Sequence, residues 1–230
     1  MPAMTYTPPK IDYPDSDGKP MADNTKQFGW IVTIKEGLDW LFRDRPDVFV
    51  AGDLLWYPVE GKNTIRVAPD ALVAFGRPKG YRGSYMQWKE NNIAPQVVFE
   101  VLSPGNTQRQ MAHKLEFYER YGVEEYYLYD PDRGVLQGWI GGDGKLEAID
   151  AMQGWVSPLL GIRFGLEGVD LQLVRPDGQP FESYGEVAAR AEQERQRAEQ
   201  ERQRAEQERQ RAERLAEQLK ALGLDPDSLR

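Results

Sequence analysis

The heptad AEQERQR occurs three times without interruption between residues 191 and 211. A seven-residue repeat built from alanine, glutamate, glutamine and arginine is typical of a long α-helix. A coiled coil needs apolar residues at two core positions of each heptad. Alanine and then leucine recur at the first core position, but the second holds glutamate in three heptads, which makes a weak coiled-coil core. We therefore expect a charged heptad-repeat helix or coiled coil over residues 185–223, supported by pairs such as Glu192–Arg195, with self-association through its last leucine-rich turns left open.

Such a helix buries no core of its own, so a globular fold has to come from the residues before it. Residues 1–23 are rich in proline and aspartate and lack an apolar stretch like that of a signal peptide. We expect them to form a disordered lead-in, and residues 224–230 to form a disordered tail. The remaining residues, 24–184, are long enough for one domain of ordinary size.

The pattern within residues 24–184 indicates both helices and strands. Apolar residues at helical spacing after Asn24 or Thr25 predict a first helix, and NTQRQMAHKLEFYERYG predicts a second, opened by Asn106 or Thr107 and closed by Gly122. Segments rich in β-branched and aromatic residues predict strands at 48–59, 96–104, 124–131 and 135–140, with further short strands up to about residue 174. The segment 64–78 predicts a strand pair or a strand bent around Pro69–Asp70. We therefore predict an α/β fold in which a mixed central sheet is flanked by helices.

The chain has no cysteine and a single histidine, His113. The missing thiols exclude disulfides, zinc–thiolate sites and cysteine nucleophiles, and a metal site would be built almost wholly from carboxylates. Oxygen ligands favour Mg²⁺, Mn²⁺ or Ca²⁺. No run approaches the roughly eighteen apolar residues of a membrane span. Without an export signal, the cytoplasm is the expected location.

The strand QVVFEVLSP places Glu100 between Phe99 and Val101, where a bare buried carboxylate costs several kcal/mol. Two other strand-like segments carry one acid each, Asp53 in VFVAGDLLWY and Asp70 in PDALVAFG. If these strands are neighbours in one sheet, the three carboxylates converge on an oxygen-coordinated cation, which would compensate the charge of Glu100. Alternatively, Glu100 pairs with an arginine or lysine, or lies in water at the end of the sheet.

The second predicted helix carries a lysine that can reach the sheet. Met111, Leu115 and Tyr118 form its apolar stripe, and Lys114 lies on the shoulder of that stripe, whereas His113 falls near the opposite side. The alternative for Lys114 is a surface lysine whose stem covers apolar neighbours. A serine hydrolase using Ser103 with the histidine is disfavoured, because no nucleophile-elbow pattern surrounds that serine and the histidine points away.

The PD dipeptide at 69–70, VVFEVLSPGNT at 97–107 and HKLEFYERYGVEEYYLYDP at 113–131 together resemble the Uma-type restriction endonuclease family of the PD-(D/E)XK nuclease superfamily. The resemblance extends over residues 25–174. It implies a restriction-endonuclease-like core and a metal-dependent endonuclease that hydrolyses DNA phosphodiester bonds.

The resemblance also implies the site residues. Asp70 and Glu100 match the motif acids and would hold Mg²⁺ or Mn²⁺ together with the backbone carbonyl of Val101, with Asp53 as a further candidate ligand. Lys114 matches the family lysine and would position the attacking water or stabilise the developing negative charge. The metal ion would polarise the phosphate and lower the pKa of a bound water.

Two positions depart from the wider pattern. The lysine that the superfamily usually carries two residues after the glutamate is replaced by Leu102, and Gln110 stands where the family often has an acid. Together with the acidic surface, these departures support an alternative. In this alternative, the chain is a nuclease-like protein of weak or no activity that acts as an interaction module through the charged helix over residues 185–223.

Acidic and basic side chains balance within residues 186–220, and of the net charge of −8 the residues before this segment carry −7. This argues against a broad nonspecific nucleic-acid surface. The loop 77–89 is locally basic and interleaved with aromatic residues, which makes it the best candidate for DNA contact; its basic residues are Arg77, Lys79, Arg82 and Lys89. A solvated loop with its aromatic side chains in the core is the alternative. Homo-oligomerisation through the nuclease domain or the C-terminal helix is left open.

Overall fold

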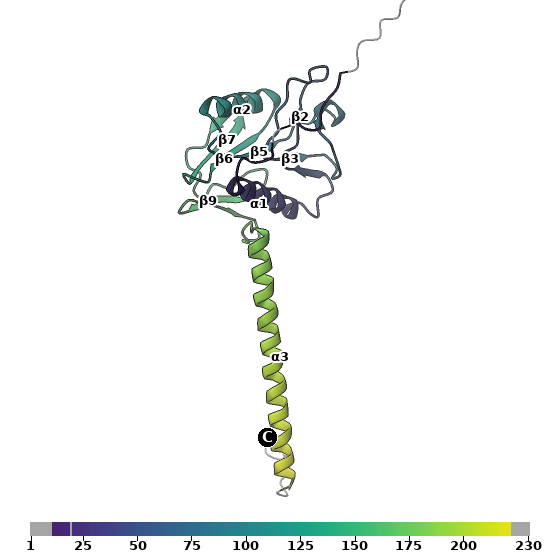
Figure 1. Cartoon of the computed structure of the whole chain (residues 1–230), viewed down its shortest axis with the longest axis vertical. Coiled ribbons are helices and arrows are strands. Elements are labelled where there is room, and N and C mark those ends of the chain that lie inside the picture. The colour runs from purple at the N-terminus through teal and green to yellow at the C-terminus, as the bar shows by residue number, and fades with distance from the viewer. Residues whose placement is uncertain (1–10, 19, 222–230) are drawn as a thin grey trace, which may run out of the picture. The chain divides into compact units, whose positions relative to one another are not determined.

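The computed structural model describes residues 11–18 and 20–221 and divides into two compact units, Met1–Phe181 and Glu182–Arg230 (Figure 1). The disorder expected for residues 1–10 and for the tail 224–230 concerns residues outside this described part. Among the described residues, no helix is both long enough and apolar enough to cross a membrane.

The first unit is built on a mixed six-stranded sheet, as predicted. The strand order is β1-β3-β5-β6-β7-β8. Only β5 and β6 pair in parallel, because α2 (Gln108–Tyr121) crosses over between them, and the other pairs are antiparallel. The strand bounds are β1 Val48–Ala51, β3 Ala71–Phe75, β5 Val97–Val101, β6 Glu125–Asp130, β7 Val135–Gly142 and β8 Lys145–Ala148.

Helices cover both faces of this sheet, so its central strands are apolar on both sides (Figure 1). On one face, α1 (Thr25–Leu41) and the hairpin of β9 (Arg163–Glu167) and β10 (Asp170–Val174) bury one core cluster that includes Ile34 and Phe99. On the other face, α2 packs with β2 (Trp56–Tyr57) and β4 (Tyr85–Met86), a short parallel pair, and buries a second cluster that includes Trp56 and Tyr118. A 3₁₀ turn, η1 (Gln87–Lys89), follows β4.

The helix ends follow from local capping. Asn24 caps α1 by accepting from the backbone N–H of Gln27 at 2.9 Å. Thr107 and Gln110 form a reciprocal capping box at the start of α2, and Gly122 ends that helix in the left-handed conformation, with φ of 93°. Of the two N-caps predicted for each helix, Asn24 and Thr107 are the residues that cap, and the predicted end at Gly122 is confirmed.

The single strand predicted over residues 48–59 is wrong. The chain leaves β1 at Gly52, and Asp53 takes the left-handed region with φ of 46°, which breaks the extended run before β2 begins at Trp56. Aspartate tolerates this region better than the branched residues around it. The break places Asp53 in a turn after β1, at the end of the sheet.

Part of the lead-in expected to be disordered over residues 1–23 is attached to the first unit. The ring of Tyr13 contacts Tyr57 at 5.2 Å and Trp88 at 5.0 Å between centroids. The Tyr57 hydroxyl donates to the carbonyl of Pro14 at 2.7 Å. Aromatic burial fixes this stretch, although its composition is polar.

The second unit consists of α3 (Tyr184–Ala221), a helix of 38 residues with no buried side chain. Ser183 and Glu186 exchange hydrogen bonds at its start. The predicted pair Glu192–Arg195 is present, with 3.0 Å between nitrogen and oxygen. The repeat therefore forms the long charged helix that its composition predicted.

Candidate active site

Three acids lie in one row across neighbouring strands of the sheet. Asp70 directly precedes β3, and the β3–β5 register sets it opposite Glu100. The β1–β3 register continues to Asp53, whose backbone N–H donates to the carbonyl of Asp70 at 3.3 Å. Backbone pairing thus brings together residues that are separated by 17 and 30 positions in the sequence.

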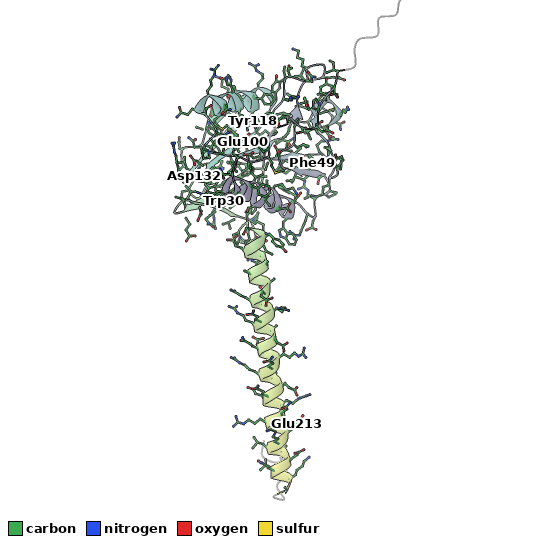
Figure 2. All side chains as sticks on the ribbon, viewed as in Figure 1. Trp30, Phe49, Glu100, Tyr118, Asp132 and Glu213 are labelled. Carbon is green, nitrogen blue, oxygen red and sulfur yellow. The ribbon has the colours of Figure 1, made fainter. Side chains whose placement is uncertain are left out.

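The carboxylate of Glu100 is almost wholly buried and is paired with two side chains from α2. Lys114 Nζ donates to Glu100 Oε2 at 2.6 Å, and the Tyr118 hydroxyl donates to Oε1. Lys114 and Tyr118 are four residues apart, so they lie on the same face of the helix. The Glu100 side chain is 3% exposed and that of Lys114 is 26% exposed, so the lysine lies on the solvent side of the carboxylate. Glu100 and Tyr118 are labelled in Figure 2.

Asp70 is held in place by the strand next to it. Its Oδ2 accepts from the backbone N–H of Val101 at 2.6 Å. The carbonyl of Val101 in turn accepts from the side chain of Gln27 at 2.8 Å. A carbonyl oxygen has two lone pairs, so this contact leaves one of them for a further donor or a cation.

The electrostatics of the cluster reflect two acids that share one lysine. Burial raises the pKa of Asp70 well above its ordinary value, and the negative charge of Glu100 raises it further. Burial works against the charge of Lys114, but Glu100 and Asp70 outweigh it and raise the pKa of the ammonium group. The pKa of Asp53 is also raised, first by burial and then by Asp17, with Lys114 acting in the opposite direction. Repulsion between the carboxylates thus adds to burial in favouring the protonated form of Asp70, and a cation would relieve that repulsion.

The donor set fits a hard divalent cation. Asp70, Glu100 and the Val101 carbonyl supply only oxygen, which Mg²⁺ and Mn²⁺ prefer, and such ions usually keep several waters. Each oxygen of Glu100 already accepts one bond, so ligation would use its remaining lone pairs. Among the residues that the structure describes, no group of three or more His, Cys, Asp or Glu side chains is placed to hold a metal. Protein ligands alone would not fill the coordination shell.

Two of the four basic residues predicted to contact DNA are engaged elsewhere. Arg77 Nε and Arg82 Nε bind the two oxygens of the buried Glu90 at 2.8 and 2.7 Å, and both arginine side chains are only 12% exposed. The guanidinium group of Arg82 also lies over the ring of Phe49, 3.9 Å from its centroid. These contacts make the two arginines part of the framework of the loop.

The other two basic residues of the loop, Lys79 and Lys89, are exposed. Tyr81 is 95% exposed, whereas Tyr85 is buried. The surface of the loop therefore offers two ammonium groups and the ring of Tyr81, whereas Trp88 is only partly exposed and packs against Tyr13.

The residues of the serine hydrolase alternative do not meet. Ser103 donates its hydroxyl to Asp23 and lies 3.2 Å from the side-chain oxygen of Asn106. His113 is exposed on α2, where its nearest acid is Glu116 at 3.8 Å. The histidine therefore faces away from the sheet, as the helical wheel predicted.

Three residues with a structural part in the site were not predicted from the sequence. Tyr118 was assigned only to the apolar stripe of α2, although its position four residues after Lys114 was a usable signal. Gln27 is a polar residue in the first turn of α1, and nothing in the local pattern ties it to β5. Glu90 follows directly after the basic loop, and its hydrogen bonds from both arginines depend on the fold of that loop. Gln110, noted for replacing an acid, caps α2.

Residues 19–174 match the Uma2 family, described as "Putative restriction endonuclease". No curated protein matches the chain. Among solved structures, a crystal structure of a putative nuclease belonging to DUF820 from Anabaena variabilis is similar, with 17% sequence identity and a TM-score of 0.46. The similarity covers 64% of this chain and 81% of that one. Because the family match extends over more than half of its residues, this chain belongs to the Uma2 family of putative restriction endonucleases.

Proposed function

We propose that this protein is a metal-dependent endonuclease that hydrolyses DNA phosphodiester bonds, with Asp70, Glu100 and Lys114 as its catalytic residues. The observation that carries the proposal is the 2.6 Å contact between Lys114 Nζ and the buried carboxylate of Glu100, next to a second buried acid with a raised pKa. Two acids and one lysine in a partly closed site match the requirements of metal-assisted phosphodiester hydrolysis. Membership of the Uma2 family supports the same reaction class.

Each residue has a defined part in this proposal. When bound, Mg²⁺ or Mn²⁺ supplies the positive charge that polarises the phosphate and activates water. The Val101 N–H and the Tyr118 hydroxyl hold the carboxylates of Asp70 and Glu100 in place, and each carboxylate keeps lone pairs with which it would bind the cation. Lys114 lies at the exposed side of Glu100, where its ammonium group can stabilise the negative charge that grows on the phosphate.

DNA contact is proposed for the exposed part of the loop 77–89. Lys79 and Lys89 are free to neutralise phosphates, and the exposed ring of Tyr81 is available for stacking on a base. Arg77 and Arg82 are left out of this proposal, because both bind Glu90.

The test is cleavage of supercoiled plasmid in Mg²⁺ or Mn²⁺. We expect EDTA to abolish cleavage, and Glu100→Gln, Asp70→Asn and Lys114→Met each to lower the rate by about 100-fold or more. Glu116→Gln is the matched control, because Glu116 is an exposed acid on the same helix and should leave the rate unchanged. Cleavage that persists at the same rate in all three active-site variants would refute the proposal.

A second candidate function is a nuclease-like interaction module that does not cut. It is favoured by the pairing of both Glu100 oxygens with Lys114 and Tyr118, which already compensates the buried charge. Calorimetric titration with Mn²⁺ separates the two functions. Binding that is lost in Asp70→Asn supports the nuclease, and no binding at millimolar metal supports the module.

A further inference from the structure

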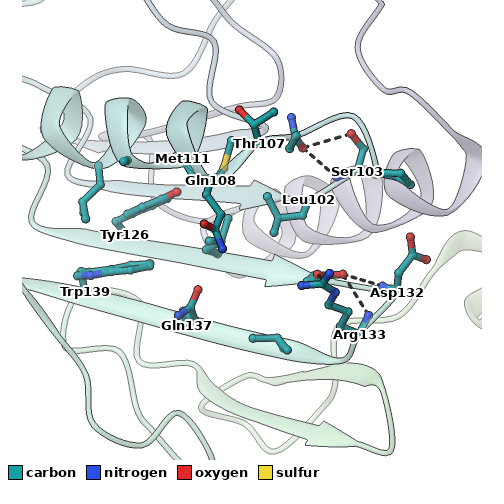
Figure 3. Close-up of a pocket in the computed structure, with 17 residues that line it drawn as sticks. Leu102, Ser103, Thr107, Gln108, Met111, Tyr126, Asp132, Arg133, Gln137 and Trp139 are labelled. Carbon is teal, nitrogen blue, oxygen red and sulfur yellow. Dashed lines mark hydrogen bonds and ion pairs between the residues drawn. The ribbon is translucent and has the colours of Figure 1, made fainter.

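A pocket of about 710 Å³ lies on the α2 face of the sheet, beside the candidate active site (Figure 3). Its walls are the loop after β5, one side of α2 and the strands β6 and β7. A pocket of this volume accommodates a ligand of the size of a nucleotide. None of the residues assigned to catalysis or metal binding lines it.

The interior of this pocket suits a flat, largely apolar ring. Leu102, Met111 and Leu115 supply aliphatic surface. The rings of Tyr126 and Trp139 stack on each other with an interplanar angle of 17° and 4.9 Å between centroids. Tyr126 is 1% exposed and Trp139 is partly exposed, so the aromatic wall open to a ligand is mainly the Trp139 ring. Aromatic walls of this kind bind planar heterocycles by stacking.

The charges around the pocket favour a neutral group over a phosphate. Two acids, Asp130 and Asp132, and one base, Arg133, line the rim. The backbone N–H groups of Asp132 and Arg133 donate to Asp130 Oδ1 at 3.0 and 3.1 Å, which fixes the direction of that carboxylate (Figure 3). The start of α2 is already capped by Thr107 and Gln110, so it offers little to an anion. A carboxylate in such a place accepts from the N–H groups of a nucleobase.

The pocket is connected to the catalytic cluster through two tyrosines. The ring of Tyr126 lies 5.0 Å from that of Tyr118, which donates to Glu100. The Tyr126 hydroxyl has no hydrogen-bond partner among the described residues, although the residue is 1% exposed. A buried hydroxyl without a partner is unfavourable, and the carbonyl and ring-nitrogen atoms of a base are acceptors of the kind that it lacks. The same helix, α2, presents Lys114 to Glu100 and Met111 to the pocket.

We propose that this pocket binds one unpaired nucleobase of the strand to be cut, next to the scissile phosphate. A base within a regular duplex cannot enter such a pocket, so the preferred substrate is single-stranded DNA or a duplex with an unpaired nucleotide at the cleavage position. This inference rests on the proposed function, because it takes the pocket as part of the same substrate site.

The test is the affinity of the full chain for labelled oligonucleotides, measured by fluorescence anisotropy in EDTA so that binding is read without cleavage. We expect a single strand, and a duplex with one unpaired nucleotide, to bind about tenfold tighter than a fully paired duplex, the value of one stacked base. Ala112→Trp fills the pocket from an exposed position on α2 and should remove this preference. His113→Trp adds the same ring at the next exposed position, outside the pocket, and should keep it.

Equal binding of paired and unpaired DNA, or an unchanged preference in Ala112→Trp, would overturn the inference. Replacing the unpaired nucleotide by an abasic one should lower the affinity as far as Ala112→Trp does. The plasmid assay separates this result from the proposed chemistry. Cleavage without any preference for unpaired DNA would refute only the base-binding role of the pocket. A preference for unpaired DNA without cleavage would refute the nuclease activity and leave the base-binding role supported.

Discussion

Glu100 carries its charge inside an apolar strand because two donors from α2 satisfy both of its oxygens. The sequence alone left open whether Glu100 pairs with a basic side chain or binds a metal ion, and the structure shows the pairing with Lys114. The ion pair does not exclude a metal site, because Asp70 adds a second buried acid that the single lysine does not neutralise. An ion pair and a cation site are therefore compatible at this position.

Tyr118 and Tyr126 form a matched pair for testing the hydrogen bond to Glu100. Both are buried on the same face of the sheet and their rings touch, but only Tyr118 donates to the carboxylate. We expect Tyr118→Phe to lower the free energy of unfolding by about 2 kcal/mol, since bonds to charged groups are the stronger ones. Tyr126→Phe should leave it unchanged or slightly raised, because its hydroxyl has no partner among the described residues. Urea unfolding at neutral pH measures both, and equal losses in the two variants would contradict this assignment.

Glu90, directly after the loop 77–89, is likewise a buried carboxylate whose charge is compensated by paired side chains. Burial opposes the charge of this carboxylate, but the guanidinium groups of Arg82 and Arg77 outweigh it, so the pKa of Glu90 is lowered from its ordinary value of 4.5. A lowered folded-state pKa contributes stability that is present above pH 4.5 and is lost as the pH falls through the folded value.

Glu90→Gln is therefore expected to destabilise the protein in a pH-dependent way. At pH 7 the loss should be about 3 kcal/mol, because two partly buried guanidinium groups lose their partner. The difference from wild type should shrink at a second, acidic pH below the lowered folded-state pKa of Glu90, where the wild-type carboxylate also becomes protonated. Urea titrations at both pH values measure this, with Asp47→Asn in the exposed Arg45–Asp47 pair as the control that should change little. A difference that stays constant with pH would argue against the ion pair.

At the scale of elements, α1 offers two glycines in opposite surroundings. A Cβ at Gly37 would lie 2.1 Å from the ring of Phe181, whereas a Cβ at Gly29 would meet nothing within 4 Å. We expect Gly37→Ala to destabilise by about 1–3 kcal/mol through overpacking, and Gly29→Ala to stabilise by up to about 1 kcal/mol through helix propensity. Thermal unfolding of the two variants shows whether each substitution raises or lowers the stability. Stabilisation by both would contradict the close packing of α1 against Phe181.

The elements themselves were largely predictable, because capping residues and period-two patterns are local signals. The two-sided burial of β5 could be read from VVFEV, and the capping of α2 from Thr107 and Gly122. The break between β1 and β2 was missed, since the apolar run continues through Gly52 and Asp53 in the sequence. Only the sheet register determines that Asp53, Asp70 and Glu100 share a row.

At the scale of the whole molecule, the two units differ in how they hold their structure. The first unit, Met1–Phe181, has two apolar cores, and all six tryptophans lie within its residues. The helix of the second unit has no buried side chain and is held by helix propensity and by ion pairs that are weak one by one. The two units should therefore unfold differently.

We expect tryptophan fluorescence to report one cooperative thermal transition, and circular dichroism at 222 nm to report in addition a broad, earlier loss of helix. Non-coincident transitions follow because a helix without tertiary packing melts gradually. Leu215→Gln with Leu219→Gln should leave the fluorescence transition in place. Self-association of α3 would instead make the helical transition sharper and dependent on protein concentration. Coincident transitions by both probes at all concentrations would contradict independent units.

The sequence by itself determined the long charged helix, the mixed α/β character of the first unit, the family and the three acids with their lysine as candidates. These follow from local periodicity, capping and motif spacing, which act over a few residues. The tertiary structure decided which donors compensate Glu100, that Arg77 and Arg82 serve Glu90, and that a pocket lies between α2 and β7. The side-chain contacts among these join residues 8 to 18 positions apart. Their geometry is set by sheet register and by packing across the cores, which no local pattern encodes.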